Sequence, residues 1–468
     1  MSAARQTLQE DSWSSFEKRA GMSLATIYAV RMIGLFMILP VFSLYADQYE
    51  GATHILVGLA LGIYGLTQGL LQIPYGMLSD RVGRKPMIAL GLVVFALGSL
   101  LAAYAESIYG VIAGRALQGA GAVAAVLMAL AADLSREEHR LKMMGFIGVS
   151  IGFAFAISMV AGPFLNQLVG MSGLFLLTAV LAMLALLILF FWVPNPQQSL
   201  FHRDTQAVPT QFKSVLADRQ LLRLDFGIMV LHMVLMATYV AFPLMLQNQA
   251  GLASEDHWKL YLPVFLLSVA LMVPFIIVAE SKRRMKQVFV GAIGVLAVAE
   301  INLLFGGASV WHLAISMVVF FSAFNLLEAS LPSLVAKMSP ADRKGTAMGI
   351  YSSSQFIGAF IGGAAGGLAY ELGGAQAVYL FCSFALLLWL LLAYSMKNPR
   401  YVSTYLLKIG KIDPSQVNQM VSTLVSVQGV AEAVVEPDEG IAYLKVELHA
   451  LDKDALLAYS INETQLTK

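Results

Sequence analysis

The stretch GMLSDRVGRKPMIAL, residues 76–90, places a short charged loop between two long apolar runs. The loop holds one acidic and three basic side chains, namely Asp80, Arg81, Arg84 and Lys85. Basic residues beside a membrane-spanning run fix its orientation, which accounts for the three bases but not for the acid. A turn this short needs a glycine, which accounts for Gly83. Gly76 predicts close contact with another helix, because glycine otherwise weakens a helix interior.

The composition indicates a membrane protein. Of 468 residues, 58% are hydrophobic and 13% are charged, whereas a soluble domain carries roughly 25% charge. Apolar runs of about 20 residues, the length that crosses a bilayer, recur along most of the chain. These runs are continuous rather than alternating, which excludes a β-barrel. The expected class is therefore an all-α polytopic membrane protein, with the lipid bilayer as its surroundings.

The same figures exclude several kinds of partner. The net charge of +1 gives no reason to expect nucleic-acid binding. The single cysteine, Cys382, excludes a disulfide framework and a cysteine metal site. The sequence contains no nucleophile–base pair and no metal-ligand spacing, so neither an enzyme nor a metal is expected. We expect no cofactor, and the sequence does not indicate an oligomeric state.

The apolar runs predict twelve membrane spans in two sets of six. The predicted spans are 21–46, 54–79, 86–105, 108–133, 141–168, 171–193, 221–248, 258–280, 286–307, 310–337, 343–371 and 375–397. A segment rich in proline, glutamine and charge separates the two sets. The expected organisation is a cytosolic tail over 1–20, an N-terminal six-helix bundle over 21–193, a cytosolic linker over 194–220 and a C-terminal six-helix bundle over 221–398.

Charge distribution and internal similarity add to this organisation. Nearly all basic residues of the loops fall on one side of the predicted membrane, so both termini are expected in the cytosol. A shift of 204 residues aligns KMMGFIGVSIGFAFAISMVAGPFLNQLVG with TAMGIYSSSQFIGAFIGGAAGGLAYELGG. Glu280 and Arg284 also follow the eighth span much as Asp80 and Arg84 follow the second. Such internal repeats are typical of secondary transporters, although chance similarity between small-residue helices is the alternative.

Residues 399–468 differ in character and predict a small soluble domain. YVSTYLLKI indicates a strand, Asp413 and Pro414 begin an amphipathic helix, and AEAVVE and IAYLKVELHAL form a hairpin. A second helix is expected after Asp452. The order β-α-β-β-α predicts a cytosolic ferredoxin-like α+β domain, whose last strand is missing or supplied by the tail. The domain lacks the cysteine pair of a heavy-metal site.

The charged loop resembles a known signature. Gly76-x-Leu78-Ser79-Asp80-Arg81-x-Gly83-Arg84-Lys85 is similar to motif A of the major facilitator superfamily, G-x-L-[AS]-D-R-x-G-R-K, at nearly every position. Its place between the second and third spans also matches. The resemblance covers all twelve spans and implies the major facilitator fold, in which two bundles rock about a central site. The added C-terminal domain resembles that of a bacterial inner-membrane member of the family, which implies the same membrane and a multi-pass location.

The resemblance also implies a gate. Asp80 is expected to face the N-terminal end of the eleventh span, where the helix dipole and Arg343 or Lys344 favour a carboxylate. Arg84 is expected to reach both Asp80 and Asp133 and to fasten the cytosolic gate in the outward-facing state. Asp133 is alternatively an ordinary carboxylate at a helix end. The remaining gate residues of the motif are Gly76, Arg81, Gly83 and Lys85.

Four charged residues lie within predicted spans, where a charge usually faces a cavity or a partner. Arg115 begins RALQGAGA, which resembles motif B of the superfamily and implies a role in proton transfer through a neighbouring acid, since arginine itself stays protonated. Glu328 is the expected proton carrier, and Glu300 is expected to be more peripheral. Arg31 is either a structural companion of Arg115 or a contact for an anionic substrate group. Each of the four is alternatively a paired charge that holds helices together.

The substrate cavity and the direction of transport are less specified. Polar or amphipathic residues on apolar helices are candidates for the cavity, and each of them could equally contact lipid headgroups or another helix: Tyr28, Arg31, Tyr239, Asn325, Tyr351 and Gln355. Gly162 and Pro163 partly match the antiporter motif C and are expected to pack helices, but Ser158 replaces the first glycine of that motif.

The expected function is secondary active transport by alternating access, as proton-coupled export of a small amphipathic compound. A proton-linked importer or uniporter of a small solute is the first alternative. A transporter-derived sensor that signals through the soluble domain is the second. The partial motif C and the membrane acids favour export.

Overall fold

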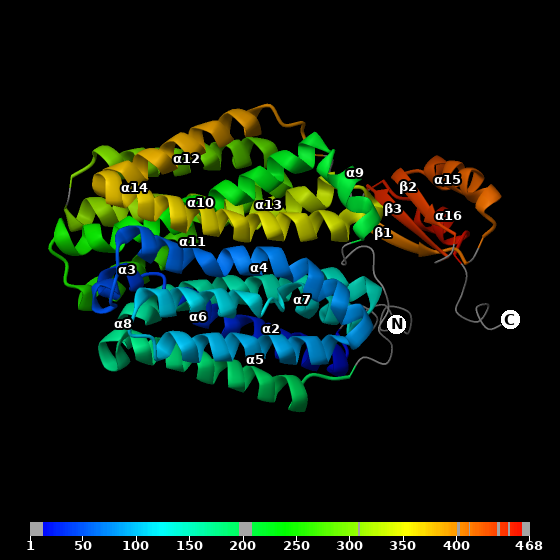
Figure 1. The fold of residues 1–468 in the computed structure, drawn as a ribbon. Helices are drawn as coiled ribbons and strands as arrows, with labels where there is room; N and C mark the ends of the chain where they lie inside the picture. The colour runs from blue at the N-terminus through cyan, green and yellow to red at the C-terminus, as the bar shows by residue number, and fades with distance from the viewer. Residues whose placement is uncertain are drawn as a thin grey trace, which may run out of the picture.

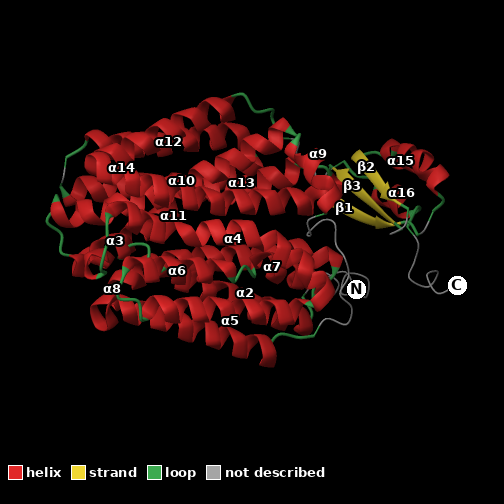
Figure 2. Ribbon diagram, viewed as in Figure 1, coloured by secondary structure: helices red, strands yellow, loops and turns green. Residues whose placement is uncertain are grey.

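The computed structural model describes residues 13–195, 208–307, 309–399, 403–410, 412–437, 440–447 and 450–460. Long helices lie alongside one another in one body, and a small α+β domain lies beyond one end of it (Figures 1 and 2). The helices of the N-terminal half form one side of the body and those of the C-terminal half the other (Figure 1). The end of the body next to the α+β domain carries Arg84, Lys85, Arg136, Lys337 and Lys344 and is called the basic end below.

The described helices of the N-terminal half are α2 (Ser15–Phe36), α3 (Phe42–Tyr45), α4 (His54–Val82), α5 (Arg84–Ala103), α6 (Ile108–Ala120), α7 (Ala124–Asp133) and α8 (Glu137–Phe191). α4 and α5 are separated by Gly83 alone, whose φ of 104° lies in the region that favours glycine. The expected short loop over 80–85 is therefore almost wholly helical, and the glycine expected for its turn is Gly83.

The described helices of the C-terminal half are α9 (Phe212–Leu216), α10 (Arg219–Asn248), α11 (His257–Ser281), α12 (Met285–Phe305), α13 (Val310–Met338) and α14 (Lys344–Tyr394). A short 3₁₀ helix, η4 (Ala341–Arg343), connects α13 to α14 at the basic end. Another, η2 (Pro209–Gln211), precedes α9.

Nine stretches of helix among the described residues are long and apolar enough to cross a membrane. Two of them, α8 with 55 residues and α14 with 51, are too long for one crossing. α8 turns at Gly170 and α14 turns at Gly373 and Gly374, where the backbone is not helical, so each makes two crossings. With α2 these helices account for the twelve predicted spans.

Two spans differ from the prediction in detail. The first was expected over 21–46, but α2 begins at a capping box between Ser14 and Glu17 and ends at Phe36, four residues before Pro40. Charged residues before position 21 hid this start from a hydropathy argument. The fourth span, expected as one helix over 108–133, is interrupted between α6 and α7. Gly121 lies at this interruption.

The two halves pack closely along α4 and α14. A Cβ added at Gly58, Gly62 or Gly363 would overlap backbone atoms of the facing helix. Small residues at such a seam allow two helix backbones to approach, as they do in other membrane helix pairs. The glycine-rich face predicted for the eleventh span therefore packs against the opposite half as well as against α10, which Gly358 contacts at Met229.

Described polar contacts between the two halves gather away from the basic end. Those closest to the opposite end are Ser43 Oγ to Tyr239 O at 3.2 Å, Tyr45 Oη to Ser254 Oγ at 2.9 Å, His54 N to Glu371 Oε2 at 3.1 Å and Gln167 Nε2 to Glu255 O at 2.5 Å. Nearer the basic end, Gln72 donates to Ser353 at 2.9 Å. Beyond that contact, Met77 and Leu78 of α4 are exposed. The body is therefore fastened at the opposite end.

The C-terminal domain has the predicted order β-α-β-β-α. It consists of β1 (Ser403–Lys408), α15 (Val417–Ser426), β2 (Val430–Glu436), β3 (Ile441–Val446) and α16 (Lys453–Leu457). The antiparallel sheet has the order β1-β3-β2, as expected for a ferredoxin-like arrangement. A last strand supplied by the tail would lie outside the described residues. One face of the sheet packs with α15 and α16 in a separate apolar core that includes Leu424, Leu444 and Leu456.

Candidate functional site

The charged loop forms a compact cluster at the basic end. The Arg84 guanidinium contacts the Asp80 carboxylate one turn earlier, and its Nε lies 3.2 Å from Asp133 Oδ2. Arg84 Nη1 also donates to Ser79 Oγ at 2.5 Å, and that hydroxyl donates to the Gly76 carbonyl. The side chains of Arg84 and Asp133 are buried, whereas 33% of the Asp80 side chain is exposed. Arg84 thus brings together both predicted carboxylates.

The other residues of the loop serve different contacts. Lys85 Nζ donates to the Val193 carbonyl at 2.6 Å, so the loop also holds the end of α8. Arg81 is exposed. The close helix contact predicted for Gly76 is wrong, because an added Cβ would meet only Ala125 at an ordinary 3.7 Å.

Asp80 makes its ion pair within the N-terminal half. The predicted contact between Asp80 and Arg343 or Lys344 is not among the contacts of the described residues. Arg343 Nε instead lies 3.3 Å from its neighbour Asp342. Since the body is fastened at the opposite end, this arrangement fits a state in which the basic ends of the two halves are apart.

Two buried arginines share Tyr64 in the N-terminal half. Arg31 donates from Nη2 to Tyr64 Oη at 2.8 Å, to Gln68 Oε1 at 2.6 Å and to the Gly121 carbonyl at 3.2 Å. Arg115 lies over the Tyr64 ring, 5.2 Å from its centroid. The Gly121 carbonyl belongs to the interruption between α6 and α7, so Arg31 satisfies a backbone group that the broken helix leaves free. Arg31 therefore joins three spans.

Arg115 is held entirely by neutral acceptors among its described contacts. It donates to Gln118 Oε1 at 3.0 Å and to the carbonyls of Ala60 and Leu61 at 3.3 and 3.4 Å. Gln118 in turn donates to Ser99 at 2.8 Å. The predicted neighbouring acid is not among these contacts.

A polar cluster around Glu328 lies in the C-terminal half. Gln355 Nε2 donates to Glu328 Oε1 at 3.2 Å and lies 2.8 Å from His232 Nε2. His232 Nε2 also lies 3.8 Å from Glu328 Oε2, and 38% of the Glu328 side chain is exposed. Asn325, also on α13, donates to Ser268 at 3.3 Å. α10, α13 and α14 thus supply one group each to the cluster.

Glu328 lies one turn from a contact between the two halves. One turn before it on the same helix face, Phe324 stacks with Phe155 of α8 at 6.1 Å between ring centroids. Phe155 also meets Phe265 and Phe321, so aromatic rings from both halves form a layer beside the carboxylate. This layer and the Glu328 cluster together form the candidate central site.

Other predicted site residues are buried in packed positions. Glu300 is fully buried and accepts from Thr238 at 2.8 Å, which places it between α10 and α12. The ring centroid of Tyr239 lies 6.3 Å from the ring centroids of both Tyr261 and Phe321. The side chains of Tyr239, Tyr28 and Tyr351 are all buried. A Cβ added at Gly162 would overlap the Met37 carbonyl, so this glycine packs α8 closely against the end of the first span, while Pro163 lies within α8.

The comparisons with known proteins agree with this architecture. The sequence model of the Major Facilitator Superfamily matches residues 24–285 and 264–414. The chain belongs to the major facilitator superfamily. The chain is similar to Inner membrane transport protein YajR of Escherichia coli (strain K12), with 46% identity over 434 residues that cover 92% of this chain and 94% of that protein. This transporter is also 29% identical to Tetracycline resistance protein, class B, of Escherichia coli, over 39% of this chain and 46% of that one.

A solved structure shows the same fold. A bacterial homolog of the human lysosomal transporter Spinster, in an inward-facing and occupied conformation, matches with a TM-score of 0.67. The match covers 82% of this transporter and 97% of that chain, at 13% identity. The predicted major facilitator fold is confirmed.

A second charged cluster in this transporter escaped the sequence argument. Glu17 accepts from the backbone and side chain of Arg136 and contacts His139 Nδ1 at 3.0 Å. This cluster ties the start of α2 to the start of α8 at the basic end. The capping pattern of Ser14 and Glu17 was a readable signal for the helix start, whereas Arg136 and His139 lie at the start of α8, distant in the sequence and without a motif of their own.

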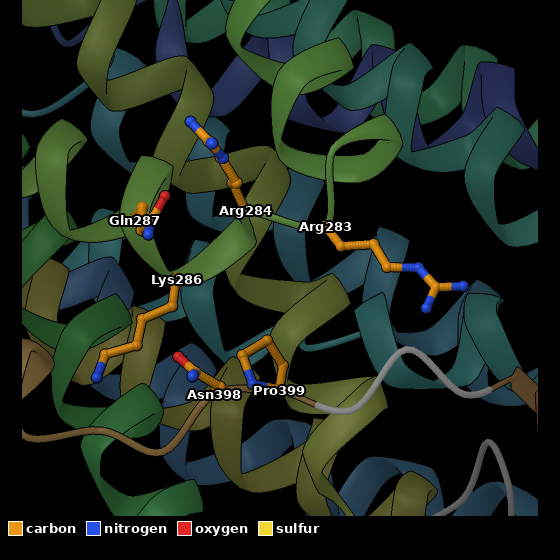
Figure 3. Close-up of a pocket in the computed structure, with 6 residues that line it drawn as sticks. All are labelled: Arg283, Arg284, Lys286, Gln287, Asn398 and Pro399. Carbon is orange, nitrogen blue, oxygen red and sulfur yellow. The ribbon is translucent and has the colours of Figure 1, made fainter.

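A surface hollow lies away from the central site. It has a volume of about 230 Å³ and is formed where the turn between α11 and α12 meets the chain that leaves α14. Its lining residues are Arg283, Arg284, Lys286, Gln287, Asn398 and Pro399 (Figure 3). Its position at the basic end separates it from Glu328 and from the aromatic layer.

Proposed function

We propose that this transporter exports a small amphipathic compound in exchange for protons, with Glu328 as the proton carrier. The observation that carries the proposal is the Glu328 side chain, which is 38% exposed, accepts from Gln355 through Oε1 and lies one turn from the aromatic contact between the halves. A carboxylate in this position can exchange a proton with whichever side of the membrane the seam is open to. Its neutral form suits an apolar site, and its charged form suits an amphipathic cation.

The surroundings of Glu328 support an amphipathic substrate. The rings of Phe155, Phe265, Phe321 and Phe324 form a buried apolar layer near one acidic group, and part of this layer would face a substrate when the two halves separate there. Aromatic faces attract organic cations, and few polar groups are needed to orient a ligand in a mostly apolar pocket. Glu300 is the second proton-binding candidate of the proposal, because it is a buried carboxyl bonded through one oxygen to Thr238. Arg115 would act by orienting neutral groups around it.

The proposed orientation follows the basic loops. We place the basic end, both termini and the C-terminal domain in the cytosol, because basic loops stay on that side. The similarity to an inner membrane transport protein supports the inner membrane as the location. With this orientation, the fastened opposite end faces outward and the described conformation is the inward-facing one.

Export is favoured over import by two observations. A relative over part of the chain carries the name of a resistance protein. The packing of Gly162 against the end of the first span is consistent with an antiporter motif C. Motif A would then fasten the cytosolic side when the opposite end opens.

Transport into everted membrane vesicles tests this function. Tetracycline and the dye cation ethidium serve as probes, and an imposed pH gradient, acidic inside, serves as the energy source. We expect uptake of at least one probe, and we expect Glu328→Gln to abolish gradient-driven accumulation while exchange of probe across the membrane continues. Glu106→Gln, an exposed carboxyl in a loop at the opposite end, is the control and should change neither. Uptake that ignores the gradient would indicate a uniporter, and accumulation in the reverse direction would indicate an importer.

A further inference from the structure

The sheet of the C-terminal domain is covered on both faces. An antiparallel sheet usually packs on one face and meets water on the other. In β3, Ala442, Leu444 and Val446 point into the core formed with the domain's own helices. Tyr443 and Lys445 point the other way, because side chains alternate along a strand, and both are buried as well. The second face of β3 therefore lies against the membrane body.

Lys445 makes the decisive contact on this second face. Its Nζ donates to the carbonyl oxygens of Ala336 at 3.2 Å and Lys337 at 3.0 Å, in the last turn of α13. Only 4% of Lys445 is exposed. The last carbonyls of a helix lack partners within the helix and carry partial negative charge, so an ammonium group there satisfies two acceptors and the helix dipole. A lysine from the soluble domain thus caps a membrane helix.

The capped turn holds an ion pair of the C-terminal half. Lys337 Nζ donates to both carboxylate oxygens of Glu280 at 2.9 and 3.0 Å, which joins the end of α13 to the end of α11. Lys337 stands 204 residues after Asp133, the shift that relates the two halves. Asp133 makes an ion pair of its own in the N-terminal half with Arg84, although the shift does not relate Arg84 to Glu280. Each half therefore has an ion pair at its basic end, with the charges exchanged between them.

The segment that follows α13 is held from a second direction. Gln211, just before α9, donates to the Asp342 carbonyl at 3.3 Å and accepts from Thr346 Oγ1 at 3.0 Å. Both β2 and β3 pack against η4. The connection between α13 and α14 is thus enclosed by the linker on one side and by the sheet on the other (Figure 1).

We propose that the C-terminal domain restrains the C-terminal half of the transporter through Lys445, which is a positioning residue for the Glu280–Lys337 ion pair. While the domain is docked, Lys445 fixes the backbone of the turn from which the Lys337 side chain extends. Displacement of the domain removes the ammonium group that two carbonyls share, which leaves the Ala336 carbonyl with the longer bond from Ser339 and loosens the end of α13 relative to α11. Any partner that binds the second face of β3 competes with α13 and therefore changes the mobility of this end of the half.

Two measurements on the full chain test the proposal. Nitroxide labels at Ser422→Cys on α15 and Ser281→Cys at the end of α11, in a Cys382→Ala background, report the distance between domain and body. Hydrogen exchange of the backbone amides over 336–346 reports the mobility of the α13–α14 connection. Lys445→Met is the test variant. Lys453→Met, an exposed lysine on α16 of the same domain, is the matched control.

We expect Lys445→Met to broaden the label distance and to speed exchange over 336–346 several-fold, while Lys453→Met changes neither. Glu280→Gln should leave the distribution of label distances narrow but speed exchange at the end of α13. This variant removes the Glu280–Lys337 ion pair and leaves the Lys445 contact intact. Exchange of the sheet amides shows whether the domain remains folded, and Lys445→Gln replaces the methionine variant if it does not. An unchanged distance in the Lys445 variant, or a broadened distance with unchanged exchange over 336–346, would overturn the proposal.

Discussion

Arg84 Nε lies 3.2 Å from Asp133 Oδ2, in an ion pair whose two side chains are buried. The pair fastens the turn between α4 and α5 to the end of α7, three spans that meet at the basic end. Its partner Asp80 contacts the same guanidinium from a more exposed position. One arginine thus serves one buried structural carboxylate and one carboxylate that remains accessible to the other half.

This difference in burial predicts a difference in stability. Asp133→Asn leaves a buried guanidinium with a single, partly exposed counter-ion, and a hydrogen bond to a charged group is worth about 1.5–3 kcal/mol, much of which is lost with the charge. Asp80→Asn should cost less, because water already reaches that carboxylate. Thermal unfolding of both variants in detergent gives the comparison. An Asp80→Asn variant at least as unstable as Asp133→Asn would contradict it.

Asp80→Asn should instead act on the conformational equilibrium. In the described state Asp80 does not bridge the halves, so its predicted contact with the start of α14 belongs to the state closed at the basic end. Removing the charge should weaken that state, shift the population toward the form open at the basic end and lower transport. A cysteine introduced by Met77→Cys, on the exposed part of α4, should be alkylated faster in the Asp80→Asn protein than in the protein that keeps Asp80. Unchanged accessibility of reporter cysteines at the opposite end would count against this prediction.

Glu17 predicts an acid-sensitive contribution to stability. Burial alone raises the pKa of Glu17, but hydrogen bonds from Arg136, Ser14 and His139 outweigh it and lower the pKa from 4.5 to about 2. A carboxyl whose pKa is lower in the folded state stabilises the fold above pH 4.5 and loses that contribution as the pH falls toward 2. The contribution is on the order of 3 kcal/mol. The difference in unfolding temperature between the unmodified protein and Glu17→Gln should therefore be large at pH 7 and shrink on acidification. A constant difference would refute the assignment.

The seam between the halves predicts a steric effect. Gly58→Ala places a methyl group against the Gly363 backbone, where no flexible side chain can move aside. The ends of α4 and α14 away from the basic end should be forced apart, which favours the form open at that opposite end. Gly145→Ala is a matched control, because a Cβ added there meets nothing within 4 Å. Labelling of cysteines introduced near His54 and Glu371 should rise in the Gly58→Ala protein and stay unchanged in the Gly145→Ala protein. Equal labelling of the two would show that the seam tolerates separation.

Much of the fold could be predicted because membrane spans are long apolar runs, and a run is visible without knowledge of its partners. The Arg84 cluster was predictable for a related reason: its motif is local, and Asp133 ends a predicted span. Arg31 was the harder case. Its acceptor at Gly121 exists only because the fourth span is interrupted, and hydropathy does not register an interruption within an apolar run. The Lys445 contact joins a soluble strand to a membrane helix 108 residues earlier, and no local pattern announces such a pair.

The two long helices turn at glycines with nearly the same backbone geometry. Gly170 has a φ of 67° and Gly374 a φ of 64°, and they stand 204 residues apart. A side chain at either position would be strained, so the same residue type makes the bend in both helices. The likeness of the two halves therefore extends from the sequence to a single backbone dihedral angle, and a substitution at either glycine would strain the same bend.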